Sequence, residues 1–131
     1  MYRRRPQESS VVHLHSTWSV AVSCLADIDP ANVLPAITAY YVMRVGQLPL
    51  VEYYPPGDKS LADAVERLAA SAHSLLLANH GPVVAGKSLA AAVNAIEELE
   101  ETARLYLLLR DLPTRFLTDE QCQRLRQLYP S

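Results

Sequence analysis

The chain has 131 residues, of which 50% are hydrophobic and 20% are charged, and its formal net charge is -2. This length fits one domain, and the charge excludes a broad electrostatic attraction for nucleic acid. The longest apolar runs are too short to span a bilayer, and Cys24 and Cys122 lie too far apart in sequence for a paired zinc knuckle. We therefore expect a cytoplasmic protein without a nucleic-acid or membrane partner, in which Arg3, Arg4 and Arg5 form a solvated end.

The first third of the chain predicts a strand, a helix and a loop. Residues 10–15 indicate a buried strand that enters a polar site. Residues 17–25 indicate a short helix, for which Ser16 or Thr17 provides the cap. Residues 27–36 contain two aspartates, an asparagine and two prolines, and this composition is typical of a loop.

The middle of the chain predicts two extended segments and a helix. Aromatic and β-branched side chains in residues 36–45 favour extended structure. Residues 48–54 predict a strand, and Pro49 places it at a sheet edge because proline cannot donate to a neighbouring strand. After a Pro-Pro-Gly-Asp turn, apolar residues recur at helical spacing. Ser60 is expected to open this helix, with Asp63 as its capping-box partner.

The last third predicts two buried strands and two helices. Residues 75–78 have no polar side chain, which is typical of a strand buried on both faces, and residues 83–85 predict a second strand. Residues 89–110 predict a long helix capped by Ser88, and a capping box at Thr118 opens a final helix. The core side of the long helix is expected to carry Leu89, Val93, Ile96, Leu99, Ala103, Tyr106 and Leu107. Strands that alternate with helices indicate an α/β layered domain.

Histidines stand at the ends of two predicted strands. His13 and His15 form an H-x-H pair whose rings share one strand face, about 6.5–7 Å apart along the backbone, and can converge on one ion. His80 follows the second buried strand, and Gly81 lets the backbone turn closely there. We predict that these three histidines bind a divalent metal ion and leave open coordination positions, with ordinary hydrogen-bonded histidines as the alternative. His73, near a helix end, is expected to cap carbonyls or contact solvent.

A second hypothesis comes from a glycine-rich motif. Residues 81–88 match the P-loop pattern G-x-x-x-x-G-K-[ST], which would make the chain a nucleotide hydrolase or kinase with Lys87 on the phosphates. The four residues between the two glycines favour a strand over a flexible loop, and no later strand ends in an aspartate that could hold magnesium. Gly86 and Ser88 are better explained as a turn and a helix cap.

Two segments resemble the metal-ligand segments of the class II aldolase/adducin family. They are residues 11–17, Val-Val-His-Leu-His-Ser-Thr, and residues 76–83, Leu-Leu-Ala-Asn-His-Gly-Pro-Val. The helix at 90–109 is similar to the helix that follows in this family. Residues 40–51 further resemble the 3-oxo-tetronate 4-phosphate decarboxylase branch.

The resemblance implies a three-layer α/β/α fold with a central mixed sheet. It implies a zinc ion, or another divalent ion, on His13, His15 and His80, and a homotetramer with active sites near subunit interfaces. In the decarboxylase branch, a carbon-carbon lyase releases CO2 from a phosphorylated sugar acid, 3-oxo-tetronate 4-phosphate, and leaves dihydroxyacetone phosphate. The metal would polarise the ketone oxygen and stabilise the enediolate that forms.

Substrate contacts are expected from one short segment. Tyr40, Tyr41 and Arg44 are candidates to face the substrate, with core packing and a surface charge as the alternative. No aspartate lies around these residues to serve as the acid/base of a sugar-phosphate epimerase, so that branch is disfavoured. No general base for the lyase reaction is evident.

The start of the chain departs from the family pattern. Family members have a longer N-terminal part, which supplies an acidic residue beside the metal and loops for the substrate phosphate. Here twelve residues precede His13, and Glu8 is their sole carboxylate. Residues 1–131 are therefore expected to form a single family domain without its usual N-terminal part. An inactive metal-binding remnant or an interaction module is the alternative.

Overall fold

A four-stranded mixed sheet organises the described residues, 1–130, of this computed structural model. The strands are β1 (Ser10–His13), β2 (Leu50–Val51), β3 (Ser74–Leu77) and β4 (Gly81–Gly86). They lie in the order β1-β4-β3-β2. β4 pairs antiparallel with both β1 and β3, whereas β2 pairs parallel with β3. β2 is thus an edge strand, as Pro49 predicts, although it is shorter than expected.

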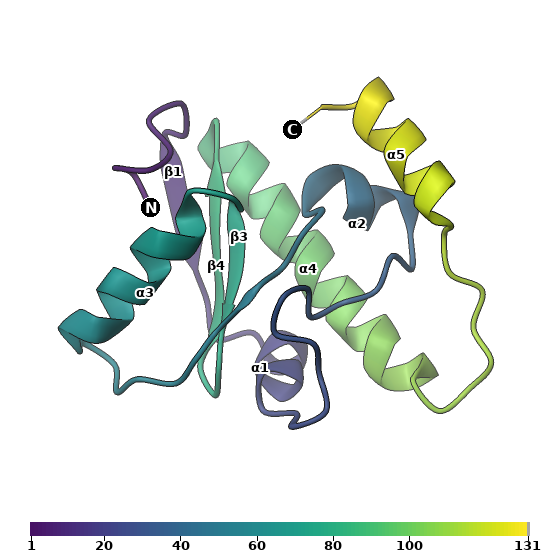
Figure 1. The fold of residues 1–131 in the computed structure, drawn as a ribbon, viewed down its shortest axis with the longest axis horizontal. Helices are drawn as coiled ribbons and strands as arrows, with labels where there is room; N and C mark the ends of the chain where they lie inside the picture. Colours follow the sequence, from purple (N-terminus) through teal and green to yellow (C-terminus); the bar gives the residue numbers. More distant parts are fainter. Residues whose placement is uncertain (131) are drawn as a thin grey trace.

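Helices cover both faces of the sheet (Figure 1). They are α1 (Thr17–Ser23), α2 (Ala39–Arg44), α3 (Lys59–Ala69), α4 (Leu89–Leu109) and α5 (Asp119–Leu128). α3 packs on one face, and α1 and α4 pack on the other, with α2 against α4. Within the described part of the chain, no helix has both the length and the apolar character needed to cross a membrane. The arrangement confirms the expected three-layer α/β/α fold with a mixed sheet.

The two central strands carry the core of both layers. Every residue of β3 and β4 is buried, which confirms the prediction of strands covered on both faces. Successive side chains of a strand point to opposite faces. Leu75 and Leu77 accordingly join the cluster beneath α3, whereas Leu76 joins the cluster beneath α1 and α4. His80 lies in the turn that joins these two strands.

One predicted element is wrong: the segment expected to be extended at residues 36–45 contains helix α2. The Thr38 side chain accepts a hydrogen bond from the backbone N–H of Tyr41 and caps the helix. Tyr41 and Val42 are buried on the side of α2 that packs against the core. The cap and this burial outweigh the β preference of the individual side chains, which is a weak and context-dependent quantity.

Two details at helix starts also differ from expectation. The N-cap of α3 is Asp58 rather than Ser60, because the Asp58 carboxylate accepts a hydrogen bond from the N–H of Ser60 at 2.8 Å. Leu89 is 62% exposed, since it is the first residue of α4 and precedes the part of the helix that packs on the sheet. The caps predicted at Ser88 and Thr118 are confirmed.

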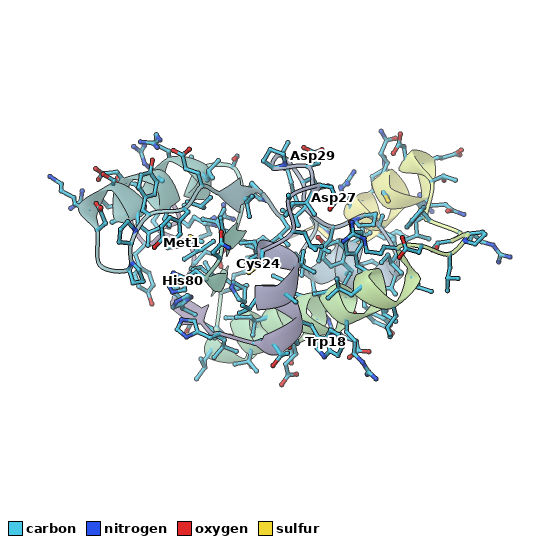
Figure 2. All side chains as sticks on the ribbon, turned by 90° about the horizontal axis from the view of Figure 1, so that it is seen from below. Met1, Trp18, Cys24, Asp27, Asp29 and His80 are labelled. Atoms are coloured by element: carbon cyan, nitrogen blue, oxygen red, sulfur yellow. The ribbon has the colours of Figure 1, made fainter. Side chains whose placement is uncertain are left out.

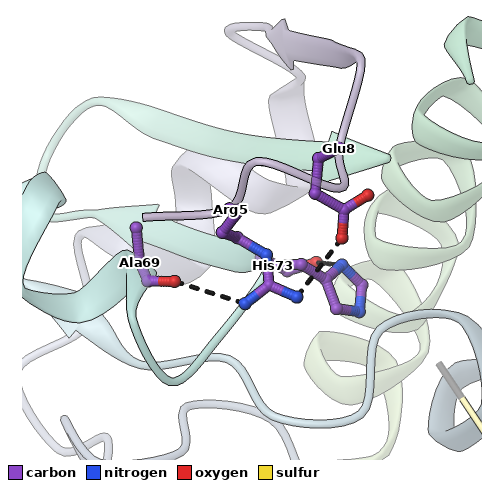
Figure 3. A network of polar contacts seen from close by, with 5 residues as sticks. Arg5, Glu8, Ala69 and His73 are labelled. Atoms are coloured by element: carbon purple, nitrogen blue, oxygen red, sulfur yellow. Dashed lines mark hydrogen bonds and ion pairs between the residues drawn. The ribbon is translucent and has the colours of Figure 1, made fainter. Parts of the chain in front are cut away.

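The basic start of the chain is not a simple solvated end. The side chain of Arg5 is 13% exposed, and it donates to the carbonyl oxygen of Ala69 and to Glu8, each at 3.2 Å (Figure 3). Ala69 is the last residue of α3, where free carbonyls and the helix dipole favour a cation. Arg5, not His73, therefore caps this helix; the Nδ1 atom of His73 lies 3.1 Å from the hydroxyl of Ser74.

Candidate metal centre

Three histidine side chains meet at the end of the sheet. The Nε2 atom of His80 lies 3.2 Å from Nε2 of His13 and 3.1 Å from Nε2 of His15. One nitrogen from each ring lies within 4.8 Å of the other two. Two ligands of a tetrahedral zinc ion, each about 2.0–2.1 Å from the metal, are about 3.3 Å apart. The spacing and the chemistry of the three donors therefore fit a divalent metal ion.

The pairing of β1 with β4 brings His13 to this place. His13 lies opposite Val83 in the antiparallel ladder, and the N–H of Leu14 still donates to Pro82, at 3.4 Å. β1 ends at His13, so His15 lies beyond the strand rather than two residues along it. The ring centroids of His13 and His15 nevertheless lie 5.0 Å apart, so the two rings are close together even though His15 is outside the strand.

The turn between β3 and β4 positions the third ring. The N–H of His80 donates to the carbonyl oxygen of Leu77, and Asn79 adopts a left-handed conformation with a φ of 56°. At Gly81 a Cβ atom would lie 2.4 Å from the carbonyl oxygen of Leu14. Glycine is thus needed here because the chain after β1 approaches β4 closely. The sequence had suggested another reason, a close turn of the backbone at this position.

A hydrogen bond fixes which nitrogen of His13 is available. Nδ1 of His13 lies 2.8 Å from the carbonyl oxygen of Pro82, which only accepts, so Nδ1 carries the proton. Nε2 then keeps its lone pair and faces the other two rings. Burial, followed by the neighbouring rings of His13 and His15, lowers the pKa of His80. The lowered pKa favours the neutral imidazole of His80, the form that binds a metal ion.

Helix α1 follows the histidine pair directly and lies beside the third histidine. Figure 2 shows His80 next to α1, which carries Trp18 near one end and precedes Cys24 at the other. The first turn of α1 donates hydrogen bonds to the carboxylate of Glu100, on α4. Glu100 lies within the helix predicted at residues 89–110. A glutamate there gives no signal of a partner 81 residues away, so this contact could not be predicted.

The three residues proposed to face substrate all lie on α2. Tyr41 is 1% exposed in the core, and burial raises the pKa of its phenol. Arg44 stacks over the ring of Tyr40, 5.1 Å from its centroid, and pairs with Glu98 at 3.4 Å. In residues 1–130 no hydrogen bond joins this group to the histidines. Tyr41 therefore packs in the core, and a substrate role of Tyr40 and Arg44 stays a prediction.

The P-loop hypothesis is wrong. Residues 81–86 are strand β4, which is hydrogen-bonded to a strand on each side. Its backbone amides are therefore committed to the sheet and cannot cradle a phosphate. The hydroxyl of Ser88 accepts from the N–H of Ala91 and caps α4. The motif match thus comes from a buried strand followed by a capped helix.

Comparisons with known proteins find relatives in sequence and in fold. A 3-oxo-tetronate 4-phosphate decarboxylase of Escherichia coli is 54% identical over 126 residues, covering 96% of this chain and 59% of the relative. An L-fuculose phosphate aldolase of Methanococcus maripaludis is 32% identical over 112 residues, 86% of this chain and 58% of the relative. The crystal structure of YgbL from Escherichia coli superimposes with a TM-score of 0.92 at 54% identity, covering 95% of this chain and 60% of that one.

The chain thus spans about three fifths of the length of these relatives. The sequence profile of the family described as Class II Aldolase and Adducin N-terminal domain matches residues 1–107. That match includes all three histidines and most of α4. The chain belongs to the class II aldolase and adducin family.

Proposed function

We propose that this chain carries the metal centre of a carbon-carbon lyase that decarboxylates 3-oxo-tetronate 4-phosphate. The observation that carries the proposal is the convergence of three histidines: Nε2 of His80 lies within 3.2 Å of Nε2 of His13 and of Nε2 of His15, and all three donors lie within 4.8 Å of one another. It is supported by the 54% identity to a decarboxylase of that name. The proposed ion is zinc, because three neutral imidazoles are a common zinc ligand set.

The residues of the site would act by holding the ion in an open geometry. His13 and His15 are exposed, so positions opposite the three rings are open to a substrate. The Pro82 carbonyl keeps Nδ1 of His13 protonated and orients its ring. When bound, a divalent ion supplies Lewis-acid stabilisation of the negative charge that develops on a ketone oxygen as CO2 departs.

Phosphate binding and proton transfer are proposed to need residues that the described chain does not bring to the site. The group of possible metal ligands within residues 1–130 contains three histidines and no carboxylate. The first N–H groups of α1, the nearest helix start, are already bonded to Glu100. We therefore propose that residues 1–131 act as one part of a larger cytoplasmic domain, assembled as a homotetramer, in which the remaining groups complete the site.

Metal analysis of the purified chain tests the first half of this proposal. We expect one zinc ion per chain for the wild type, and loss of the ion in His80→Ala. His73→Gln is the matched control, because His73 is the fourth histidine and lies outside the cluster. A wild-type chain that retains no divalent ion, or an H80A chain that retains a full equivalent, would refute the metal centre.

An assay for CO2 release from 3-oxo-tetronate 4-phosphate, run on the chain as part of the larger domain proposed above, tests the second half. Among residues 1–130 no carboxylate joins the three histidines as a possible metal ligand, and this favours a second candidate, a metal-binding remnant without activity of its own. Release of CO2 that H80A abolishes would support the lyase. A chain with one equivalent of metal and no turnover would select the remnant.

A further inference from the structure

We infer that Glu100 is a positioning residue for the three histidines and that it acts through helix α1. This inference rests on the proposed metal centre. Glu100 lies on α4, and its hydrogen bonds within residues 1–130 go to Trp18 and Ser19 rather than to the three rings. Its role is therefore to hold α1. The contacts at the two ends of α1 carry the argument.

The carboxylate of Glu100 holds the start of α1. Its Oε1 accepts from the backbone N–H of Ser19 and from the hydroxyl of Ser19, both at 2.8 Å, and its Oε2 accepts from the N–H of Trp18 at 3.2 Å. Ser19 is fully buried. Hydrogen bonds to a carboxylate are stronger than neutral ones, and the positive end of the helix dipole adds to them.

The chain offers no local substitute for this contact. Ser16 stands at the N-cap position of α1, but its side chain makes no capping hydrogen bond. The first turn of α1 also has no acidic residue of its own. The N–H groups that every helix leaves free at its start are thus bound by a residue of a different element.

The other end of α1 is attached to the turn that carries His80. The carbonyl oxygen of Ser23, the last residue of α1, accepts from the backbone N–H of Asn79 at 3.2 Å. Asn79 immediately precedes His80 and has the left-handed backbone of the turn. Since α1 begins two residues after His15, this seven-residue helix connects one ligand segment to the other.

A shift of α1 would therefore change the separation of the rings. The Nε2 atoms of His15 and His80 lie 3.1 Å apart, a spacing suited to one ion. Without Glu100 the start of α1 loses its partners, and His15 and Ser16 lose a fixed point next to them. Groups that orient metal ligands contribute about 10–100-fold to affinity. Glu100 acts through the backbone, so we expect a loss of about tenfold.

The test compares the zinc affinity of four variants of the full chain by competition titration, with Co2+ absorption as a report of ligand geometry. Glu100→Ala removes both acceptor oxygens, whereas Glu100→Gln keeps one. Glu101→Gln is the neighbouring control, since Glu101 is 56% exposed and pairs with Arg104. Thr118→Ala removes a cap of α5, far along the chain from the histidines, and controls for lower stability by itself.

We expect E100A to bind zinc about tenfold more weakly with an altered Co2+ spectrum, and E100Q to lie between E100A and the wild type. E101Q and T118A should bind within about twofold of the wild type. Wild-type affinity in E100A, or in E100Q where E100A fails to fold, overturns the inference, as does an equal loss in T118A. A wild-type chain that binds no ion overturns the proposed function as well.

Discussion

The carbonyl group of Pro82 determines which ring nitrogen of His13 faces the other two histidines. It accepts from Nδ1 of His13 and leaves Nε2 directed at the other two rings. Proline has no N–H, but its carbonyl accepts normally, and that is what the site uses. At the residue scale, the site therefore depends on backbone groups whose positions follow from the pairing of β1 with β4.

Replacement of Gly81 by alanine tests this close packing. A Cβ atom there would lie 2.4 Å from the carbonyl oxygen of Leu14, so β4 and the chain after β1 must separate. We expect Gly81→Ala to lower the free energy of unfolding by about 2–3 kcal/mol and to weaken zinc binding. Urea denaturation and zinc titration measure the two effects.

Gly57→Ala is the control for that substitution. Gly57 also has a positive φ, 85°, but no atom lies within 4 Å of its Cβ position. The expected cost is about 1 kcal/mol from backbone strain alone, with no change in zinc affinity. Equal effects of the two substitutions would show that steric contact at Leu14 is unimportant.

The buried phenol of Tyr41 predicts a dependence of stability on pH. Burial raises the pKa of Tyr41 above its ordinary value of 10.0, so the folded state keeps the proton while the unfolded chain loses it. The contribution of Tyr41 to the free energy of unfolding should be constant below about pH 9 and fall as the pH rises above 10, by up to about 1.4 kcal/mol per unit. Urea denaturation across this range measures the fall.

Tyr41→Phe identifies the group responsible. The hydroxyl of Tyr41 is buried and has no hydrogen-bond partner within residues 1–130, so its removal should not destabilise the protein at pH 7. The variant should lose the part of the alkaline fall that belongs to Tyr41. A fall of unchanged size in Y41F would contradict the assignment.

At the scale of elements, helices α2, α3 and α4 each begin where a specific side chain binds one of their first N–H groups. Thr38 does this for α2, Asp58 for α3 and Ser88 for α4. α1 differs, because Glu100 takes this role from another helix. A sequence pattern can locate the first kind of start but not the second, since only folding brings residues 19 and 100 together.

The two kinds of helix start predict costs of different size for two similar substitutions. Thr38→Ala removes the hydrogen bond to Tyr41 and should lower the free energy of unfolding by about 1 kcal/mol. Ser16→Ala at the N-cap of α1 should cost less than about 0.5 kcal/mol, because its side chain makes no cap. Urea denaturation of the metal-free proteins makes the comparison, and a larger cost for S16A would contradict the role given to Glu100.

At the scale of the whole molecule, the histidines join segments that are far apart along the chain. An ion at this site would connect the end of β1 to the turn between β3 and β4, and would bind only the folded state. Zinc at about 100 times its dissociation constant should then raise the free energy of unfolding by about 2.7 kcal/mol.

Thermal unfolding with zinc and with a chelator measures this linkage. The wild type and His73→Gln should show the stabilisation, and His15→Ala should not. A rise in H15A equal to that of the wild type would indicate that zinc binds elsewhere. The H15A variant thereby distinguishes zinc binding at the three histidines from adventitious binding elsewhere.

The sequence by itself determined the parts of this protein that depend on local pattern. An apolar run predicted β3, and helical spacing and caps predicted α4 and α5. The H-x-H pair and a later histidine predicted the three rings that meet at the end of the sheet. Tertiary structure decided the rest. Packing against the core made α2 a helix, the close approach of β1 explained Gly81, and Glu100 reached α1 across the fold. These features depend on contacts between distant residues, and the free energy of such contacts exceeds the small local preferences that a sequence displays.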